Sequence, residues 1–276
     1  MAMRSCLNTI TLGPDTELEE SLRAASEAGF GAVELFSIEG AEGYAAASGM
    51  HVLKTLLSSL SLDVVGFVLG GFVYQSEREF ADSLPGMKDS MSLAMDLGAT
   101  NALLFIPSKG EISRRAAREM AARRIGEAAD IAGDYGLTIG LEPIGKADYL
   151  NTPGEVYSLM REVDARNVAL TIDIFHFFTG GCRLADLEKL DAGDISLVHI
   201  DDAPDLPVEE LEDSKRVLPG KGDMDVVGFL SKLKSMGYDA PLSVEIFSRD
   251  LWGRPPSEVA RMAKECLDSV AGEAGI

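Results

Sequence analysis

The chain has 276 residues, 46% of them hydrophobic, and a formal net charge of −20 at pH 7. This length and apolar content allow one large core, and a single α/β barrel reaches this size. The negative charge repels phosphate backbones, which argues against nucleic acid as a partner. The three cysteines lie far apart without CxxC spacing, as is typical of a chain without disulfides in a reducing compartment.

Neither a secretion signal nor a membrane span is expected. The first ten residues, MAMRSCLNTI, contain no continuous apolar core. The longest apolar run, 64–74, has 11 residues and includes three glycines, so it is too short to cross a bilayer. We therefore expect a cytoplasmic protein that does not bind membranes.

Short apolar runs typical of strands alternate along the chain with longer helical patterns. The predicted strands cover 6–10, 31–36, 62–69, 101–107, 138–144, 168–175, 195–200 and 241–247. A helix after the first strand begins with acidic residues and stops at Gly29, and a long Ala/Arg-rich helix covers 113–136. Thr152 and Pro153 start another helix, and two more follow the last two strands.

Eight strands, each followed by a helix, predict a (β/α)8 TIM barrel. The alternative is a doubly wound open sheet, which usually carries a glycine-rich phosphate-binding turn after its first strand. The segment LNTITLGPD at that place lacks such a turn. Because the chain contains no linker or low-complexity segment, we predict one barrel domain over residues 1–276, with chemistry at the carboxyl ends of the strands.

The last four predicted strands each end in side chains that can bind a metal, namely Glu142, Asp173, His199 and Glu245. Side chains alternate along a strand, so Glu142 and Glu245 are expected to point toward the barrel axis. Carboxylates gathered in one barrel mouth repel each other, and a divalent cation removes this repulsion. We therefore predict one divalent ion (Mn²⁺, Co²⁺, Mg²⁺ or Zn²⁺) with His199 as a ligand, and we expect Asp201 to orient His199 or a neighbouring group.

Each of these residues also has a structural interpretation. A single acid at a strand end is usually a solvated cap, and a lone histidine is more often a hydrogen-bonded core residue. Four such residues on consecutive strands favour the metal site. His176, three residues after Asp173, either caps a loop or belongs to the site, and Trp252 either fills the core or packs against a sugar ring.

Four segments resemble the xylose-isomerase-like superfamily of TIM-barrel sugar isomerases and epimerases, with inosose (keto-inositol) isomerase as the nearest branch. They are GLTIGLEPIG, LTIDIFHFF, LVHIDDAPDLPVEELEDSKRVLPGKGDMD and LSVEIFS, all between residue 136 and residue 248. The resemblance implies the same four metal ligands, and it implies that His176 and Arg216 bind substrate oxygens. In the related epimerases the two ligand glutamates also transfer the proton. The segment PIGKADYLNTP after Glu142 lacks the polar pattern that the D-tagatose/D-psicose 3-epimerases have at this place. The substrate of those epimerases therefore cannot be assigned to this chain.

We therefore expect a metal-dependent isomerase or epimerase of a small sugar, cyclitol or keto-polyol, which transfers a proton next to a carbonyl through a metal-stabilised ene-diolate. Glu142 and Glu245 are the predicted catalytic pair. The predicted substrate-binding residues are His176, Arg216, Asp201 and Trp252. The long segment 202–225 contains Gly220 and Gly222 and is either an active-site lid or an exposed acidic loop.

Three other functions remain open at this point. A dehydratase like the 3-dehydroshikimate or inosose dehydratases of the superfamily would use a similar intermediate and expel a hydroxyl group. A nuclease like endonuclease IV needs a histidine-rich cluster for several zinc ions, and this chain has only three histidines. Its charge of −20 also disfavours binding to nucleic acid. A non-catalytic sugar-binding barrel is the third alternative. The sequence does not decide between a monomer and a homo-oligomer.

Overall fold

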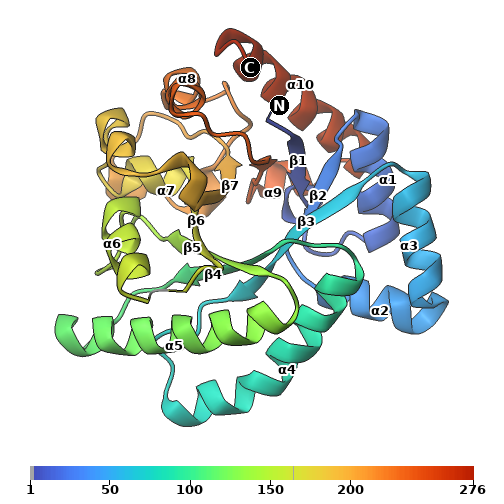
Figure 1. Cartoon of the computed structure of the whole chain (residues 1–276). Coiled ribbons are helices and arrows are strands. Elements are labelled where there is room, and N and C mark those ends of the chain that lie inside the picture. The colour runs from blue at the N-terminus through green and yellow to red at the C-terminus, as the bar shows by residue number, and fades with distance from the viewer. Residues whose placement is uncertain (1–2, 164) are drawn as a thin grey trace.

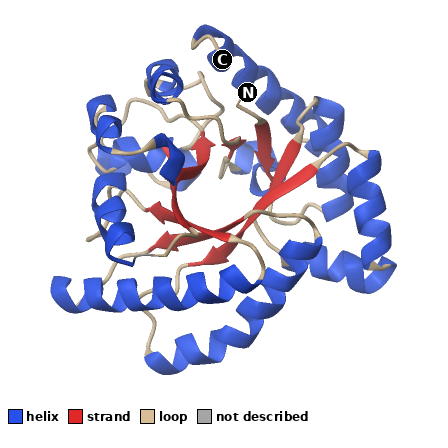
Figure 2. Ribbon diagram, viewed as in Figure 1, coloured by secondary structure: helices blue, strands red, loops and turns tan. Residues whose placement is uncertain are grey.

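The computed structural model describes residues 3–163 and 165–276 and shows a closed barrel of parallel strands inside a ring of helices (Figures 1 and 2). Strands adjacent in the sequence are adjacent in the barrel, and β8 pairs with β1 to close it. The strands are β1 (Ser5–Asn8), β2 (Ala32–Leu35), β3 (Asp63–Gly70), β4 (Asn101–Ile106), β5 (Thr138–Pro143), β6 (Val168–Asp173), β7 (Ile195–Ile200) and β8 (Leu242–Val244). The closed sheet confirms the predicted TIM barrel and excludes the doubly wound alternative.

The outer ring consists mainly of long helices, with shorter turns of helix at the carboxyl ends of β1, β6 and β8. The α-helices are α1 (Leu18–Ala28), α2 (Glu39–Ser48), α3 (Met50–Ser59), α4 (Glu77–Asp96), α5 (Arg114–Asp134), α6 (Pro153–Val163), α7 (Ile174–Thr179), α8 (Val226–Met236), α9 (Arg249–Trp252) and α10 (Pro256–Glu273). The 3₁₀ turns are η1 (Thr9–Leu12), η2 (Leu184–Lys189), η3 (Ala192–Asp194), η4 (Val208–Glu210) and η5 (Asp213–Lys215). In the described part of the chain, no helix is both long enough and apolar enough to span a bilayer.

Local signals in the sequence account for several helix ends. Gly29 ends α1 in the left-handed conformation (φ 90°), where a glycine has no Cβ to clash. The Ser113 hydroxyl accepts a hydrogen bond from the Ala116 N–H at the start of α5, and the Thr152 hydroxyl does the same for Glu155 in α6. These caps confirm the predicted helix starts.

Alternation along the strands separates the barrel interior from the layer under the helices. Ile139 and Leu141 of β5 are fully buried in the apolar layer between the strands and the helices, whereas Gly140 and Glu142 have the opposite orientation. Burial of each large apolar side chain in this layer contributes about 1.5–3 kcal/mol to folding. The layer forms a rigid support for the polar groups at the carboxyl ends of the strands.

Three predicted strand ends are wrong, and each error lies at the functional end of the barrel. The strand predicted over 168–175 ends at Asp173, whose Oδ1 accepts the His176 N–H (2.8 Å) and starts α7. The strand predicted over 6–10 ends at Asn8, whose side chain accepts the Ile10 N–H and starts η1. The eighth strand ends at Val244 rather than at residue 247. In the first two cases a side-chain cap competes with the strand ladder for backbone groups.

Candidate metal centre

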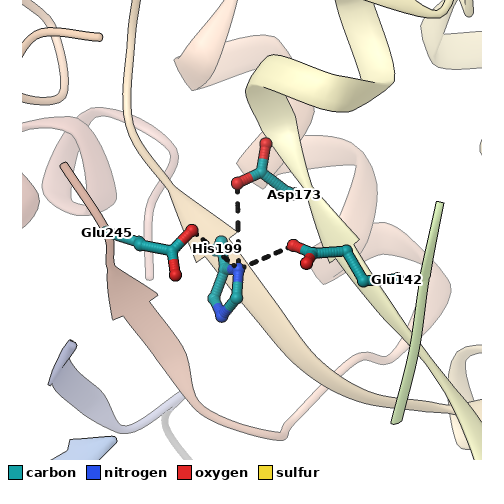
Figure 3. Close-up of side chains that lie close together, drawn as sticks. All are labelled: Glu142, Asp173, His199 and Glu245. Carbon is teal, nitrogen blue, oxygen red and sulfur yellow. Dashed lines mark hydrogen bonds and ion pairs between the residues drawn. The ribbon is translucent and has the colours of Figure 1, made fainter. Parts of the chain in front are cut away.

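Four side chains from consecutive strand ends converge at the carboxyl end of the barrel (Figure 3). Each of Glu142, Asp173, His199 and Glu245 offers one ligand atom, and these atoms all lie within 4.8 Å of one another. His199 Nδ1 lies 3.0 Å from a Glu142 oxygen and 3.4 Å from a Glu245 oxygen. An Asp173 oxygen lies 3.7 Å from the same nitrogen.

This geometry fits a cation better than a proton. One ring nitrogen carries at most one hydrogen and cannot satisfy three carboxylate oxygens at once. A set of three carboxylates and one imidazole suits a divalent ion such as Mn²⁺, Co²⁺ or Zn²⁺. All four side chains are buried, so little water is present to screen their mutual repulsion. The cluster can therefore hold one metal ion.

The pKa values of the metal-free cluster show how strongly its charges interact. Burial alone would lower the pKa of His199, but the charges of Glu245, Glu34 and Glu142 outweigh it and raise the pKa well above its usual value. Burial raises the pKa of Glu245 to about 8, against the opposing effect of His199 and Arg216. Burial also acts to raise the pKa of Asp173, but Arg216, His176 and His199 outweigh it and lower that pKa. Without a metal, the cluster therefore holds protons at neutral pH.

Two residues of the first two strands, which the sequence did not identify, support the cluster. Glu34 of β2 is fully buried, and its two oxygens lie 3.0 and 3.2 Å from His199 Nε2. Asn8 at the end of β1 donates a hydrogen bond from Nδ2 to Glu245 (3.0 Å). A signal for Glu34 was present in GAVELF, because an acidic residue inside a short apolar strand requires a buried partner.

Arg216 is buried beside the cluster. Its Nη1 donates hydrogen bonds to Asp173 (2.5 Å), Asp201 (2.7 Å) and Glu245 (3.2 Å). Its Nη2 bonds to Asp213 at 2.7 Å. The guanidinium also lies over the rings of Phe175 and Phe247, with centroid distances of 4.8 and 5.2 Å.

The other predicted substrate-binding residues differ in how close they come to the pocket. His176 lines it, and its Nε2 lies 3.2 Å from Arg216 Nη2. Asp201 is fully buried behind Arg216, and burial together with the charge of Asp173 raises its pKa well above the usual value. The Trp252 indole donates to the Ile10 carbonyl oxygen (2.8 Å), and Trp252 is not among the residues that line the pocket.

A pocket of about 410 Å³ opens above the cluster and has two different walls. The polar wall includes Glu142, His176, Asp213, Arg216 and Glu245. The apolar wall comes mainly from the first half of the barrel and consists of Phe36, Val68, Leu103, Phe105, Pro107, Ile144 and Phe247. Of the four cluster residues, only Glu142 and Glu245 line the pocket.

The segment 202–225 contributes part of the polar wall and is tied to the barrel. Asp202 pairs with Val217 through two backbone hydrogen bonds. The Lys146 ammonium donates to the carbonyl oxygens of Glu209 and Leu211. These contacts hold Asp213 and Arg216 at the pocket.

The chain is similar to known proteins along nearly its whole length. The model of the xylose isomerase-like TIM barrel family matches residues 22–270. The inosose isomerase of Bacillus velezensis is 27% identical over 98% of this chain and 98% of its own length. The 3-dehydroshikimate dehydratase of Pseudomonas putida is 27% identical over 94% of this chain, which corresponds to 40% of that protein.

Among solved structures, the IolI protein with a bound zinc atom superposes with a TM-score of 0.92. It is 25% identical in sequence, and the match covers 99% of each chain. Together with the family match over most of the chain, this similarity agrees with the resemblance found in the four sequence segments. The chain belongs to the xylose isomerase-like TIM barrel family.

Proposed function

We propose that this protein is a divalent-metal-dependent isomerase or epimerase of an uncharged cyclitol or keto sugar. The observation that carries the proposal is the buried cluster of three carboxylates and one imidazole at the base of a pocket. Similarity to inosose isomerases along nearly the whole chain supports the cyclitol. The zinc atom in the similar IolI structure supports the metal.

Access to the pocket distinguishes the roles of the four proposed ligands. When bound, a divalent ion polarises a substrate carbonyl and stabilises the negative charge that develops on its oxygen. Glu142 and Glu245 line the pocket and approach His199 from different sides (Figure 3), so they can reach two positions on a substrate. One removes the proton beside the carbonyl, and the same or the other glutamate returns it. In the polar wall, His176 is positioned to bind a substrate oxygen, and Arg216 can do so only by exchanging one of its carboxylate partners.

The charges around the pocket favour an uncharged substrate. Among the described residues that line it, the charged groups are Glu142, Asp213, Arg216 and Glu245. Arg216 is the one arginine or lysine of this set, and four carboxylates already accept its hydrogen bonds. A phosphate or carboxylate on the substrate would find no unengaged arginine or lysine among these lining residues and would face additional negative charge. The apolar wall suits the C–H face of a ring.

Dehydration is the second candidate, because 3-dehydroshikimate dehydratases match most of this chain. The same proton abstraction would then be followed by loss of a neighbouring hydroxyl group. However, 3-dehydroshikimate carries a carboxylate, and the pocket offers it no unengaged arginine or lysine among the described lining residues. The charge distribution therefore favours isomerisation of a neutral substrate.

The direct test is NMR in D₂O with protein loaded with Zn²⁺, Mn²⁺ or Co²⁺ and offered keto-inositols, ketohexoses and 3-dehydroshikimate. We expect deuterium to enter the carbon beside the carbonyl of a keto-inositol or ketohexose, and the signals of an isomer to appear. Loss of water from the substrate, detected by mass, would support the dehydratase instead. Binding of keto-inositols without exchange or turnover would contradict the proposal and support a non-catalytic sugar-binding barrel.

A further inference from the structure

We infer that Glu34 is the positioning residue that sets the tautomer and orientation of His199 for metal binding. This inference rests on the metal centre proposed above. Glu34 does not line the pocket, so it acts through the imidazole and not on the substrate. It lies 165 residues before His199 in the sequence.

Glu34 contacts the cluster through one group, Nε2 of His199. Both of its oxygens face His199 Nε2, at 3.0 and 3.2 Å. The Ser243 hydroxyl donates to Oε2 of Glu34 at 2.8 Å, which fixes the carboxylate from a second strand. An ionised carboxylate accepts hydrogen bonds and cannot donate them, so the hydrogen between Glu34 and the ring belongs to Nε2 of His199.

The consequence appears at the other ring nitrogen. With the hydrogen held on Nε2, the neutral ring has its lone pair on Nδ1, and Nδ1 faces the oxygens of Glu142, Asp173 and Glu245. The Glu34 carboxylate also makes the ring a stronger electron donor toward a metal. A glutamine at this position would keep an acceptor but lose the charge, whereas an alanine would leave Nε2–H buried without a partner.

The test is metal affinity, measured by competition with a chelator, in the wild type and in Glu34→Gln, Glu34→Ala and Ser243→Ala. Changes of this kind typically weaken a site 10–100-fold. We expect about a 10-fold loss for Glu34→Gln and about 100-fold for Glu34→Ala. Ser243→Ala, which removes only the second bond to Glu34, is expected to lose less than about 10-fold. Thermal unfolding of each metal-free variant checks that it folds, and Ser243→Ala provides a milder variant if Glu34→Ala does not.

A second readout separates positioning from a purely structural role. The chain has three histidines, so ¹⁵N-histidine NMR of the Zn²⁺-loaded protein resolves them, with His51→Gln and His176→Gln for assignment. We expect His199 to carry its hydrogen on Nε2 in the wild type. The ¹⁵N resonance of this nitrogen should shift in both Glu34 variants. Unchanged metal affinity in folded Glu34 variants, or a hydrogen on Nδ1 in the loaded wild type, would overturn the inference. Weakened binding in a protein without isomerase activity would overturn only the proposed function.

Discussion

Arg216 and His199 are the cationic groups buried among the carboxylates of the centre. Glu34 and Glu142 lie on the His199 side, Asp201 lies on the Arg216 side, and the remaining ligand carboxylates contact both. Negative groups outnumber positive ones in this centre. Burial raises the pKa of Glu245 even though two cations lie near it, and the charges of Glu142 and Glu34 add to that rise. The residue-scale properties of the site therefore follow from an excess of buried negative charge that a divalent ion would reduce.

Glu245→Gln is expected to lower kcat about 10²–10⁴-fold, the usual contribution of a general acid or base. The amide cannot accept a proton at neutral pH and is a weaker metal ligand than a carboxylate. Kinetics at saturating metal measure the catalytic part of the loss. Glu258→Gln, which removes the charge of a half-buried glutamate paired with Arg254 at the surface, provides the control and should retain wild-type rates. Equal rates for both variants would contradict the assigned role of Glu245.

Metal binding is expected to release protons and to weaken as the pH falls. The pKa of Glu245 is about 8 and that of His199 is raised well above its usual value, so both groups are protonated in the metal-free chain at pH 7. A ligand must lose its proton to bind the ion, so affinity rises with pH until these groups are deprotonated. Calorimetry in buffers of different ionisation enthalpy should detect about one to two protons released at pH 7. No release at pH 7 would show that the cluster is already deprotonated.

At the scale of elements, the segment 202–225 determines the shape of the polar wall. The Asp202 carboxylate accepts the backbone N–H groups of Ala203 (2.8 Å), Gly222 (2.9 Å) and Met224 (3.0 Å). Gly222 approaches so closely that a Cβ there would lie 2.3 Å from the Ala203 carbonyl oxygen. The two ends of the segment are therefore held together while its middle carries Asp213 and Arg216. Closure of this segment over a substrate remains a prediction.

Asp202→Ala is expected to destabilise the protein by about 2–4 kcal/mol, because hydrogen bonds to a buried carboxylate contribute about 1.5–3 kcal/mol each and part of the loss is recovered by water. It should also raise KM more than it lowers kcat, since the segment carries Arg216. Urea unfolding and the rate of tryptic cleavage at the exposed Lys215 and Lys221 measure these effects. Asp205→Ala, at an exposed position of the same segment, should leave stability and cleavage unchanged.

At the scale of the whole molecule, closure of the barrel creates the site. β1 pairs with both β2 and β8, which brings Asn8 against Glu245 across 237 residues of sequence. The last helix, α10, packs beside the first strand, β1 (Figure 1). Because groups from both halves of the chain support the cluster, metal binding should stabilise the entire barrel and not one segment.

Metal binding at 100 times Kd is expected to add about 2.7 kcal/mol to the free energy of unfolding. For a chain of this size that corresponds to an increase in Tm of about 5 °C. Calorimetry with and without a chelator measures the change. In Asp173→Asn the amide oxygen can still accept the His176 N–H, so the helix cap is kept while a ligand charge is lost. A chelator should therefore leave the Tm of this variant unchanged, and an equal shift in both proteins would argue against the assigned site.

The sequence by itself determined the barrel and its four metal-binding candidates. Both depend on patterns that are local or follow chain order: apolar alternation defines each strand, and consecutive strands of a parallel barrel are neighbours. Glu142, Asp173, His199 and Glu245 lie at the ends of β5, β6, β7 and β8, so their proximity follows from their order in the chain.

Only the tertiary structure decided which groups support that cluster and which stay apart from it. The contact of Glu34 with His199 across the barrel and that of Asn8 with Glu245 between β1 and β8 join strands that are distant in sequence. Both depend on barrel closure and strand stagger, which no local pattern encodes. The same holds for Trp252, whose position after β8 could not show that its indole bonds to the Ile10 carbonyl oxygen outside the pocket lining. Local chemistry thus identified the candidate ligands, and barrel closure determined the groups that position them.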